Sequence, residues 1–129
     1  MDNRIKISPR EQWLEYAQKG QLAYQICVDD GQPVFYPRVV APQSGSTNLE
    51  WRVSAGNGVV YATTAVMQRD QAAYNIAIIE MDEGFRLLSR VEGLDAEQVK
   101  IGSRVEVHFR RDDGGGDPYP VFRLAGVAQ

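Results

Sequence analysis

The feature that most limits the fold of this chain is a pair of short turns with the outline of a zinc knuckle. The first is Cys27-Val28-Asp29-Asp30-Gly31 and the second is Ala41-Pro42-Gln43-Ser44-Gly45. A structural zinc ribbon needs four converging donors, and two C-x-x-C turns supply them because each turn directs both sulfurs to one point. Only Cys27 remains here, since the other three positions hold Asp30, Ala41 and Ser44. The spacing therefore predicts a degenerate zinc ribbon that binds no metal.

The composition indicates an ordinary globular chain. Its 129 residues suffice for one modest core, or for one small barrel with a shorter appendage. The net charge of −3 argues against broad phosphate-backbone binding, which usually needs a basic face. A single cysteine cannot form an internal disulfide, and neither a signal peptide nor a membrane span is visible. We therefore expect a soluble, cytoplasmic protein.

A short helix is expected ahead of the ribbon. Ser8 can cap it, Pro9 suits its first turn, and Gly20 is a natural stop. Trp13 and Tyr16 fall three residues apart and give the helix one apolar stripe. That stripe must pack on its own chain or on another subunit. Because it lies outside the predicted barrel, we expect it to serve as an interface element.

The remainder of the sequence is typical of β-structure. Strand patterns cover Leu22 to Val28, Trp51 to Met67, Tyr74 to Met81, Phe85 to Val91, Val105 to Phe109 and Val121 to Val127. The small polar run Gly45-Ser46-Thr47 marks a boundary, so residues 1–47 are expected to hold the helix and ribbon and residues 48–129 the barrel. Five barrel strands, the first long and bent near Gly56-Asn57-Gly58, suit a Greek-key barrel of the OB type. The predicted fold class is therefore mainly β.

Short motifs in a fixed order run along nearly the whole chain. They are Trp13-Leu14, Gly20-Gln21-Leu22, Tyr36-Pro37-Arg38, Pro42, Gly45-Ser46, Leu49-Glu50-Trp51, Gly58-Val59-Val60-Tyr61, Glu83-Gly84-Phe85-Arg86-Leu87-Leu88, Ile101-Gly102-Ser103-Arg104-Val105 and Pro120-Val121-Phe122. In this order they resemble the zinc-ribbon and OB-fold proteins that accompany thiolases and acyl-CoA hydratases, a family long described as a domain of unknown function. The resemblance implies a rubredoxin-like ribbon followed by an OB barrel, here with degenerate zinc ligands.

The same resemblance implies a non-catalytic role in lipid metabolism. Proteins of this family typically pair with a thiolase-like or hydratase-like enzyme, and some bind acyl-CoA between ribbon and barrel. We therefore expect an accessory or scaffold subunit with no cofactor of its own, and a homodimer through the N-terminal helix stays open. The alternative is a free-standing OB module that binds single-stranded nucleic acid, which the acidic balance disfavours.

Arginines are the main candidates for ligand binding, since the chain has eleven of them against three lysines. A guanidinium is a planar fork suited to phosphates and carboxylates, so an anion such as the CoA diphosphate is a plausible ligand. Together with two aromatic residues they give the expected set Arg38, Trp51, Arg52, Tyr61, Arg69 and Arg86. The competing interpretations are surface salt bridges for the arginines and core or interface packing for the aromatics.

Catalytic groups are hard to find. Cys27 could be a nucleophile only with a base, and the one histidine, His108, sits on an alternating strand where we expect it to be exposed. Glu80 and Asp82 share a face, but beside a turn, where solubility is the simpler interpretation. The clusters Asp29-Asp30 and Asp112-Asp113-Asp117 lack the ligand spacing of a cation site. An enzyme is therefore not expected.

Overall fold

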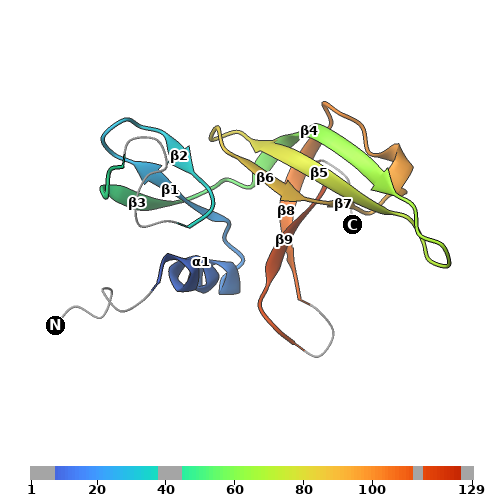
Figure 1. Ribbon diagram of the computed structural model, residues 1–129, viewed down its shortest axis with the longest axis horizontal. Coiled ribbons are helices and arrows are strands. Elements are labelled where there is room, and N and C mark those ends of the chain that lie inside the picture. The colour runs from blue at the N-terminus through green and yellow to red at the C-terminus, as the bar shows by residue number, and fades with distance from the viewer. Residues whose placement is uncertain (1–7, 38–44, 112–114, 126–129) are drawn as a thin grey trace.

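The computed structural model describes residues 8–37, 45–111 and 115–125, which form a helix and two sheets (Figure 1). Helix α1 covers Pro9–Gln18. A three-stranded sheet in the order β2-β1-β3 consists of β1 (Ala23–Cys27), β2 (Pro33–Val34) and β3 (Leu49–Val53). A six-stranded sheet in the order β6-β5-β4-β8-β9-β7 consists of β4 (Asn57–Val66), β5 (Tyr74–Met81), β6 (Arg86–Ser89), β7 (Val91–Glu92), β8 (Arg104–Arg110) and β9 (Tyr119–Leu124). A short 3₁₀ helix, η2 (Ala96–Gln98), precedes β8.

The predicted helix is confirmed, including its ends. Ser8 is extended and its hydroxyl accepts a hydrogen bond from the Glu11 backbone N–H at 3.2 Å, while Pro9 opens the helix. These are the contacts that satisfy the free N–H groups of a first turn. At the other end Gly20 adopts a φ of +75°, which an L side chain rarely adopts, and so the chain leaves the helix there.

The expected single strand from Trp51 to Met67 is wrong, because the chain changes sheets in the middle. β3 pairs antiparallel with β1, whereas β4 pairs with β5 and β8. The turn between them has Gly56 at a φ of +86°, where an added Cβ would lie 2.8 Å from Val107 Cγ1. The Gly56 N–H donates to Ser54 Oγ at 2.9 Å and closes this turn. The strand pairing puts Leu49–Val53 in the three-stranded sheet, while the division at residue 48 into independent units stays a prediction.

The barrel closes through one bent segment. β6 pairs with β5, and after Arg90 the same segment continues as β7, which pairs parallel with β9 at the opposite end of the sheet order. Asn75 stabilises this departure because its side chain accepts from the Val91 N–H at 3.0 Å and donates to Thr63 Oγ1 at 2.6 Å. With β6 and β7 taken as one bent strand, the predicted five-stranded OB barrel is confirmed.

One apolar core joins the two sheets. Its buried members are Leu22, Tyr24, Val60, Ala77, Ile79, Met81, Phe85, Leu87, Val91, Val99, Val105 and Phe122. Phe85, the residue before β6, is the point of contact: its ring stacks on Tyr24 of β1 at 4.7 Å and on Phe35 at 5.3 Å between centroids. Aromatic pairs at this spacing add to the stabilisation from area burial. The three-stranded sheet β2-β1-β3, called the ribbon sheet from here on, is therefore held against the barrel by aromatic stacking.

Helix α1 packs on its own chain. The Trp13 indole N–H donates to the Ala23 carbonyl at 3.1 Å, and the Trp13 ring meets Phe35 edge-on at 6.2 Å. The centroid of the Tyr16 ring lies 5.6 Å from that of Trp51, and the Trp51 indole N–H donates to Gln12 Oε1. The stripe that led us to expect an interface element is thus used to dock the helix on the ribbon sheet. Among the described residues, no helix is long and apolar enough to cross a membrane.

Candidate functional site

The first half of the knuckle keeps its turn. Cys27 ends β1 and is fully buried, with 0% of its surface exposed. The Gly31 N–H donates to the Cys27 carbonyl at 2.7 Å, and Gly31 has the positive φ of +72° that such a turn requires. Asp30 is exposed on the turn, where its carboxylate accepts from the Gln32 N–H at 3.0 Å. The other two relic ligand positions, Ala41 and Ser44, lie outside the described residues.

Asp29, in the first half of the knuckle, is hydrogen-bonded to the segment that follows the second half. Its carboxylate accepts hydrogen bonds from the Ser46 hydroxyl at 2.5 Å and from the Asn48 amide at 3.2 Å. These two donors, Ser46 first, hold the pKa of Asp29 below its ordinary value. Across the described ranges no group of three or more His, Cys, Asp or Glu side chains could hold a metal ion. Hydrogen bonds to a carboxylate therefore connect the first turn with the residues just before β3.

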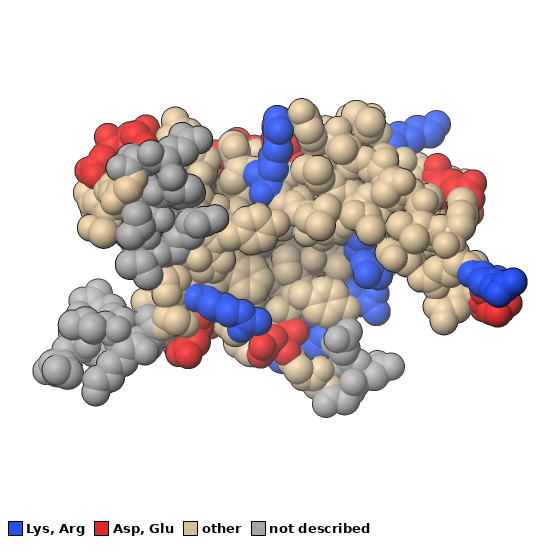
Figure 2. All heavy atoms as spheres, in the orientation of Figure 1, with Lys and Arg blue, Asp and Glu red and all other residues tan. Residues whose placement is uncertain are grey.

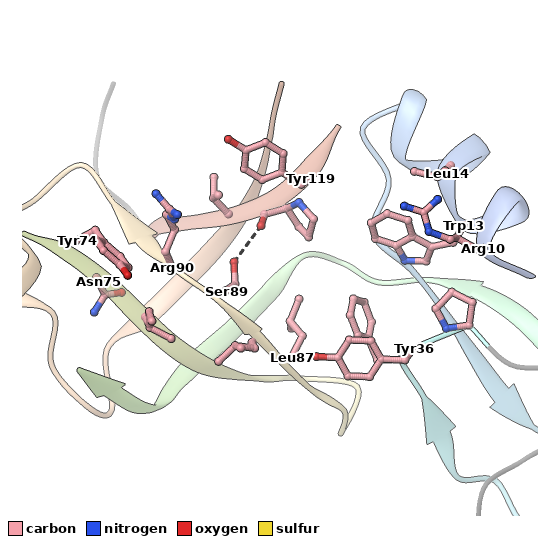
Figure 3. A pocket seen from close by; sticks show the side chains of 16 residues that line it. Arg10, Trp13, Leu14, Tyr36, Tyr74, Asn75, Leu87, Ser89, Arg90 and Tyr119 are labelled. Carbon is pink, nitrogen blue, oxygen red and sulfur yellow. Dashed lines mark hydrogen bonds between the residues drawn. The ribbon is translucent and has the colours of Figure 1, made fainter. Parts of the chain in front are cut away.

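An apolar groove of about 650 Å³ lies between helix α1 and the barrel. Figure 3 shows its side chains coming from the helix, from the segment after β2, and from β5, β6 and β9. The lining residues are Arg10, Trp13, Leu14, Phe35, Tyr36, Pro37, Tyr74, Asn75, Ile76, Leu87, Leu88, Ser89, Arg90, Tyr119, Pro120 and Val121. This volume is within the range of small-molecule sites, which are mostly apolar with a few polar groups.

Two arginines stand at opposite ends of this groove. Arg10 projects from the helix side, and Arg90 projects from the bend between β6 and β7 (Figure 3). The Arg90 guanidinium lies 5.8 Å from the centroid of the Tyr74 ring, and neither arginine forms an ion pair with a carboxylate in the described part of the chain. The Ser89 hydroxyl donates to the Pro120 carbonyl at 2.9 Å, so it is already used within the groove. The guanidinium groups of Arg10 and Arg90 are therefore available to an anionic ligand.

The ligand residues expected from the sequence do not gather at this groove. Trp51 lies on β3 against the helix, and Arg52 pairs with Glu50 at 3.2 Å on the surface of the same sheet. Arg69 is exposed in the loop between β4 and β5. Arg38 lies outside the described residues. As potential ligand contacts these four residues remain predictions.

Tyr61 and Arg86 do come together, on the outer surface of the barrel. The register between β4 and β5 shifts between Val60 and Ala62, so Tyr61 forms a β-bulge and is 48% exposed. The Arg86 guanidinium lies 3.7 Å from the centroid of the Tyr61 ring and donates to Glu80 at 2.9 Å. The hydrogen bond to Glu80 is the main reason that the pKa of Arg86 is raised. The pair is a preformed cation–π contact on the surface.

Sequence reasoning missed Arg10, Arg90 and Pro120 as groove residues. Arg90 follows a run that reads as one continuous strand, so the bend that turns its side chain into the groove is invisible in the pattern. A usable signal was present on β5, where the alternate positions Tyr74, Ile76 and Ile78 are all apolar although they do not face the core. Two apolar faces on one strand indicate that something packs on each of them.

The candidate catalytic groups are engaged elsewhere. His108 is half-buried rather than exposed, and its Nε2 lies 3.1 Å from an Arg123 nitrogen. It belongs to β8 of the barrel, whereas Cys27 is buried in the ribbon sheet. Asp82 forms a bidentate ion pair with Arg104, with both N···O distances at 2.9 Å. Hydrogen bonding from Arg104 lowers the pKa of Asp82. These contacts fit the expectation that Asp82 is a surface residue and not a general acid or base.

The fold defines a class: small proteins in which a three-stranded sheet precedes an OB barrel. The family model described as the C-terminal OB-fold domain of ChsH2 matches residues 51–110. A DUF35 domain-containing scaffold protein of Methanocaldococcus jannaschii is 36% identical over 97 residues, which cover 70% of this chain and 69% of that protein. The chain therefore belongs to the DUF35 family.

Two further similarities concern enzyme subunits. The solved structure "Ltp2-ChsH2(DUF35) aldolase" matches with a TM-score of 0.77 and 26% identity, over 96% of this chain and 94% of that one. A probable enoyl-CoA hydratase alpha subunit of Thermomonospora curvata is 28% identical over 120 residues, which cover 88% of this chain but only 36% of that subunit. The resemblance drawn from the sequence motifs is thus confirmed.

Proposed function

We propose that this chain is a non-catalytic accessory or scaffold subunit of a thiolase-like or hydratase-like enzyme. The support is that its DUF35 relatives are named scaffold proteins, and that one matching structure is an assembly in which a DUF35 chain occurs in an aldolase. In this proposal the chemistry belongs to the partner.

We further propose that the groove binds acyl-CoA, and the observation that carries this is its combination of apolar walls and terminal arginines. Leu14, Ile76 and Leu88 would contact an acyl or pantetheine chain, whose burial contributes about 0.8 kcal/mol per methylene. Arg10 or Arg90 would bind the diphosphate, for which a guanidinium is well shaped. The site is therefore assigned to Arg10 and Arg90 rather than to Trp51, Arg52 and Arg69.

The expected homodimer through the helix receives less support than a complex with an enzyme. Trp13 and Tyr16, the residues that motivated it, are engaged with Phe35 and Trp51 of the same chain. Side chains already packed on their own chain offer little additional apolar area to a second copy. We therefore propose that partner contacts lie on other surfaces.

Titration of the full chain separates acyl-CoA binding from nucleic-acid binding. Acetyl-CoA, octanoyl-CoA and a labelled single-stranded oligonucleotide would be added at physiological salt, and binding followed by calorimetry or fluorescence anisotropy. We expect octanoyl-CoA to bind more tightly than acetyl-CoA because more methylenes enter the groove. Oligonucleotide binding without a response to either thioester would contradict the assignment and favour the OB module that binds single strands.

Matched arginine variants locate the site. Arg90→Ala should weaken octanoyl-CoA binding about ten- to a hundredfold, since one charge-assisted contact is worth roughly 1.5–3 kcal/mol. Arg69→Ala, which removes an equally charged but distant exposed side chain, should leave the Kd unchanged. Weaker binding in Arg69→Ala with no effect of Arg90→Ala would move the site away from the groove.

A further inference from the structure

The outer surface of strands β4, β5 and β6 carries a run of apolar side chains beside the polar residues Thr64, Glu80 and Arg86, although the strands already bury their other face in the core. On β5 the buried positions Asn75, Ala77, Ile79 and Met81 alternate with half-buried positions that face outward. Across the strands, Ala62 of β4 lies opposite Ile78, and Ile78 lies opposite Leu88 of β6. Figure 2 shows uncharged side chains extending over these three strands. We call this surface, consisting of Tyr61, Ala62, Ile76, Ile78 and Leu88, the outer sheet face.

The outer sheet face has prominent and preorganised side chains. Leu88 is 62% exposed and the bulge at Tyr61 turns that ring outward, where it is 48% exposed. Arg86 covers the ring at 3.7 Å and is itself fixed by Glu80 at 2.9 Å. Tyrosine and arginine are enriched among the residues that dominate binding energy at protein interfaces. Holding them in place before association lowers the entropy lost on binding.

An antiparallel sheet with one solvated face normally alternates apolar and polar residues. Here the solvated face carries isoleucine and leucine where polar residues are expected, and it is continuous with the groove through Ile76 and Leu88. Contiguous apolar surface of this kind marks a site of association. The outer sheet face therefore requires an occupant.

The charges beside the outer sheet face favour a different protein over a second copy of this chain. Arg86 is compensated by Glu80, but Arg90, two residues after Leu88, and Arg10 across the groove have no carboxylate partner in the described structure. In a two-fold symmetric pair the same surface meets itself, so these cations would approach like charges. A partner with carboxylates around an apolar centre would instead complement them.

We propose that the outer sheet face is the docking surface for the catalytic partner, a folded enzyme whose contact surface is apolar at its centre and acidic at its edge. Tyr61 and Leu88 provide the central contacts, and the positive charge of Arg90 beside them favours an acidic edge on the partner. The inference rests on the proposed scaffold function and adds the surface through which that function operates. A ligand in the groove would then lie beside the interface, because Ile76 and Leu88 belong to both.

The test uses the affinity-tagged full chain expressed in its source cells. The thiolase-like or hydratase-like enzyme that copurifies is identified by mass spectrometry, purified separately and titrated with the wild-type chain and three variants. Leu88→Asp and Tyr61→Ala change the outer sheet face, whereas Val53→Asp changes a 47%-exposed apolar residue of the ribbon sheet. Circular dichroism verifies that each variant is folded, which is expected because the substituted side chains are exposed.

Leu88→Asp and Tyr61→Ala should each weaken enzyme binding about tenfold or more, and Val53→Asp should not. Equal binding by all four proteins would overturn the outer sheet face as the docking surface while leaving the scaffold function intact. If no such enzyme copurifies or binds, both the docking surface and the proposed function fail. A wild-type dimer in light scattering that Leu88→Asp converts to monomer would show that a second copy, not an enzyme, occupies the surface.

Discussion

The strands of the ribbon sheet pair antiparallel in the described structure, whereas the barrel also contains the parallel pair β7–β9, and the two parts depend on different interactions. The barrel surrounds an apolar core in which Val60, Ile79 and Phe122 are almost completely buried. Among the described residues the ribbon sheet has fewer such side chains, and Asp29 in its first turn makes polar contacts with Ser46 and Asn48. Its main apolar contact, Tyr24 on Phe85, crosses to the barrel. The barrel therefore has the elements of an independent core, whereas the ribbon depends on the barrel for its stability.

This contrast explains how a ribbon can keep its shape with three of its four ligand positions changed. A structural zinc contributes much of the folding free energy of a small isolated ribbon. Here the ribbon is not isolated, because Leu22 and Tyr24 belong to the same buried cluster as the barrel residues. Aromatic packing on a neighbouring barrel can supply free energy that coordination supplies elsewhere.

Separating the two parts should give the largest effect. Fragments 48–129 and 54–129 should both unfold cooperatively and at similar temperatures, because β3 makes its strand pairs with β1 alone. A fragment of residues 1–53 should show no cooperative transition, since it lacks Phe85. Circular dichroism during heating measures both properties. A molten 54–129 fragment would mean that barrel and ribbon form a single unit, and would also reject residues 48–129 as a domain.

Phe85→Ala should lower the free energy of unfolding by about 3–5 kcal/mol, the usual cost of removing a buried phenylalanine. Both tryptophans, Trp13 and Trp51, lie in the N-terminal part, so tryptophan fluorescence follows the ribbon while far-ultraviolet circular dichroism follows mostly the barrel. We expect the fluorescence transition to occur first in this variant. Leu88→Ala, at an exposed position of the same strand, should change stability by only about 0.5 kcal/mol. Coincident transitions in Phe85→Ala would contradict docking through this ring.

Acid should loosen the ribbon through Asp29. Because hydrogen bonding lowers the pKa of Asp29 in the folded chain, its contribution is complete above the unfolded pKa of about 4 and is lost as the pH falls through the lower folded value. Asp29→Asn should remove this part of the acid dependence of tryptophan fluorescence. Asp82→Asn, which breaks an ion pair with Arg104 in the barrel, is the matched control and should leave the fluorescence titration unchanged.

Treatment with a chelator should not change the stability of the protein, which makes it the smallest of the expected effects. A single cysteine, Cys27, cannot by itself hold a structural zinc ion, and Asp29 already binds Ser46 through a hydrogen bond. We expect purified protein to lack stoichiometric zinc in elemental analysis, and a chelator to leave its melting temperature unchanged. About one zinc per chain would show that the ribbon is still a metal site.

The sequence predicts most of the fold but little of the candidate site. Local capping predicts both termini of the helix, at Ser8 and Gly20, and alternation of apolar and polar residues predicts the strand Tyr74–Met81. Both signals act over a few residues. The change of sheet at Gly56 cannot be predicted from local sequence, because it depends on the close approach of Val107 from β8. The groove is harder still, since Arg10 and Arg90 are eighty residues apart and meet the same cavity only after α1 docks on the ribbon.

The parallel pairing of β7 with β9 has a consequence for synthesis on the ribosome. β9 is the last of the barrel strands to emerge, and without it β7 has no partner and β8 loses one of its two neighbours. Phe122 of β9 belongs to the same buried cluster as Phe85, so this cluster is complete only after that strand is translated. Although chains generally fold from the N-terminal end during synthesis, the ribbon of this chain must wait for a later segment. We expect the nascent ribbon to remain accessible to chaperones and proteases until residues 119–124 leave the exit tunnel.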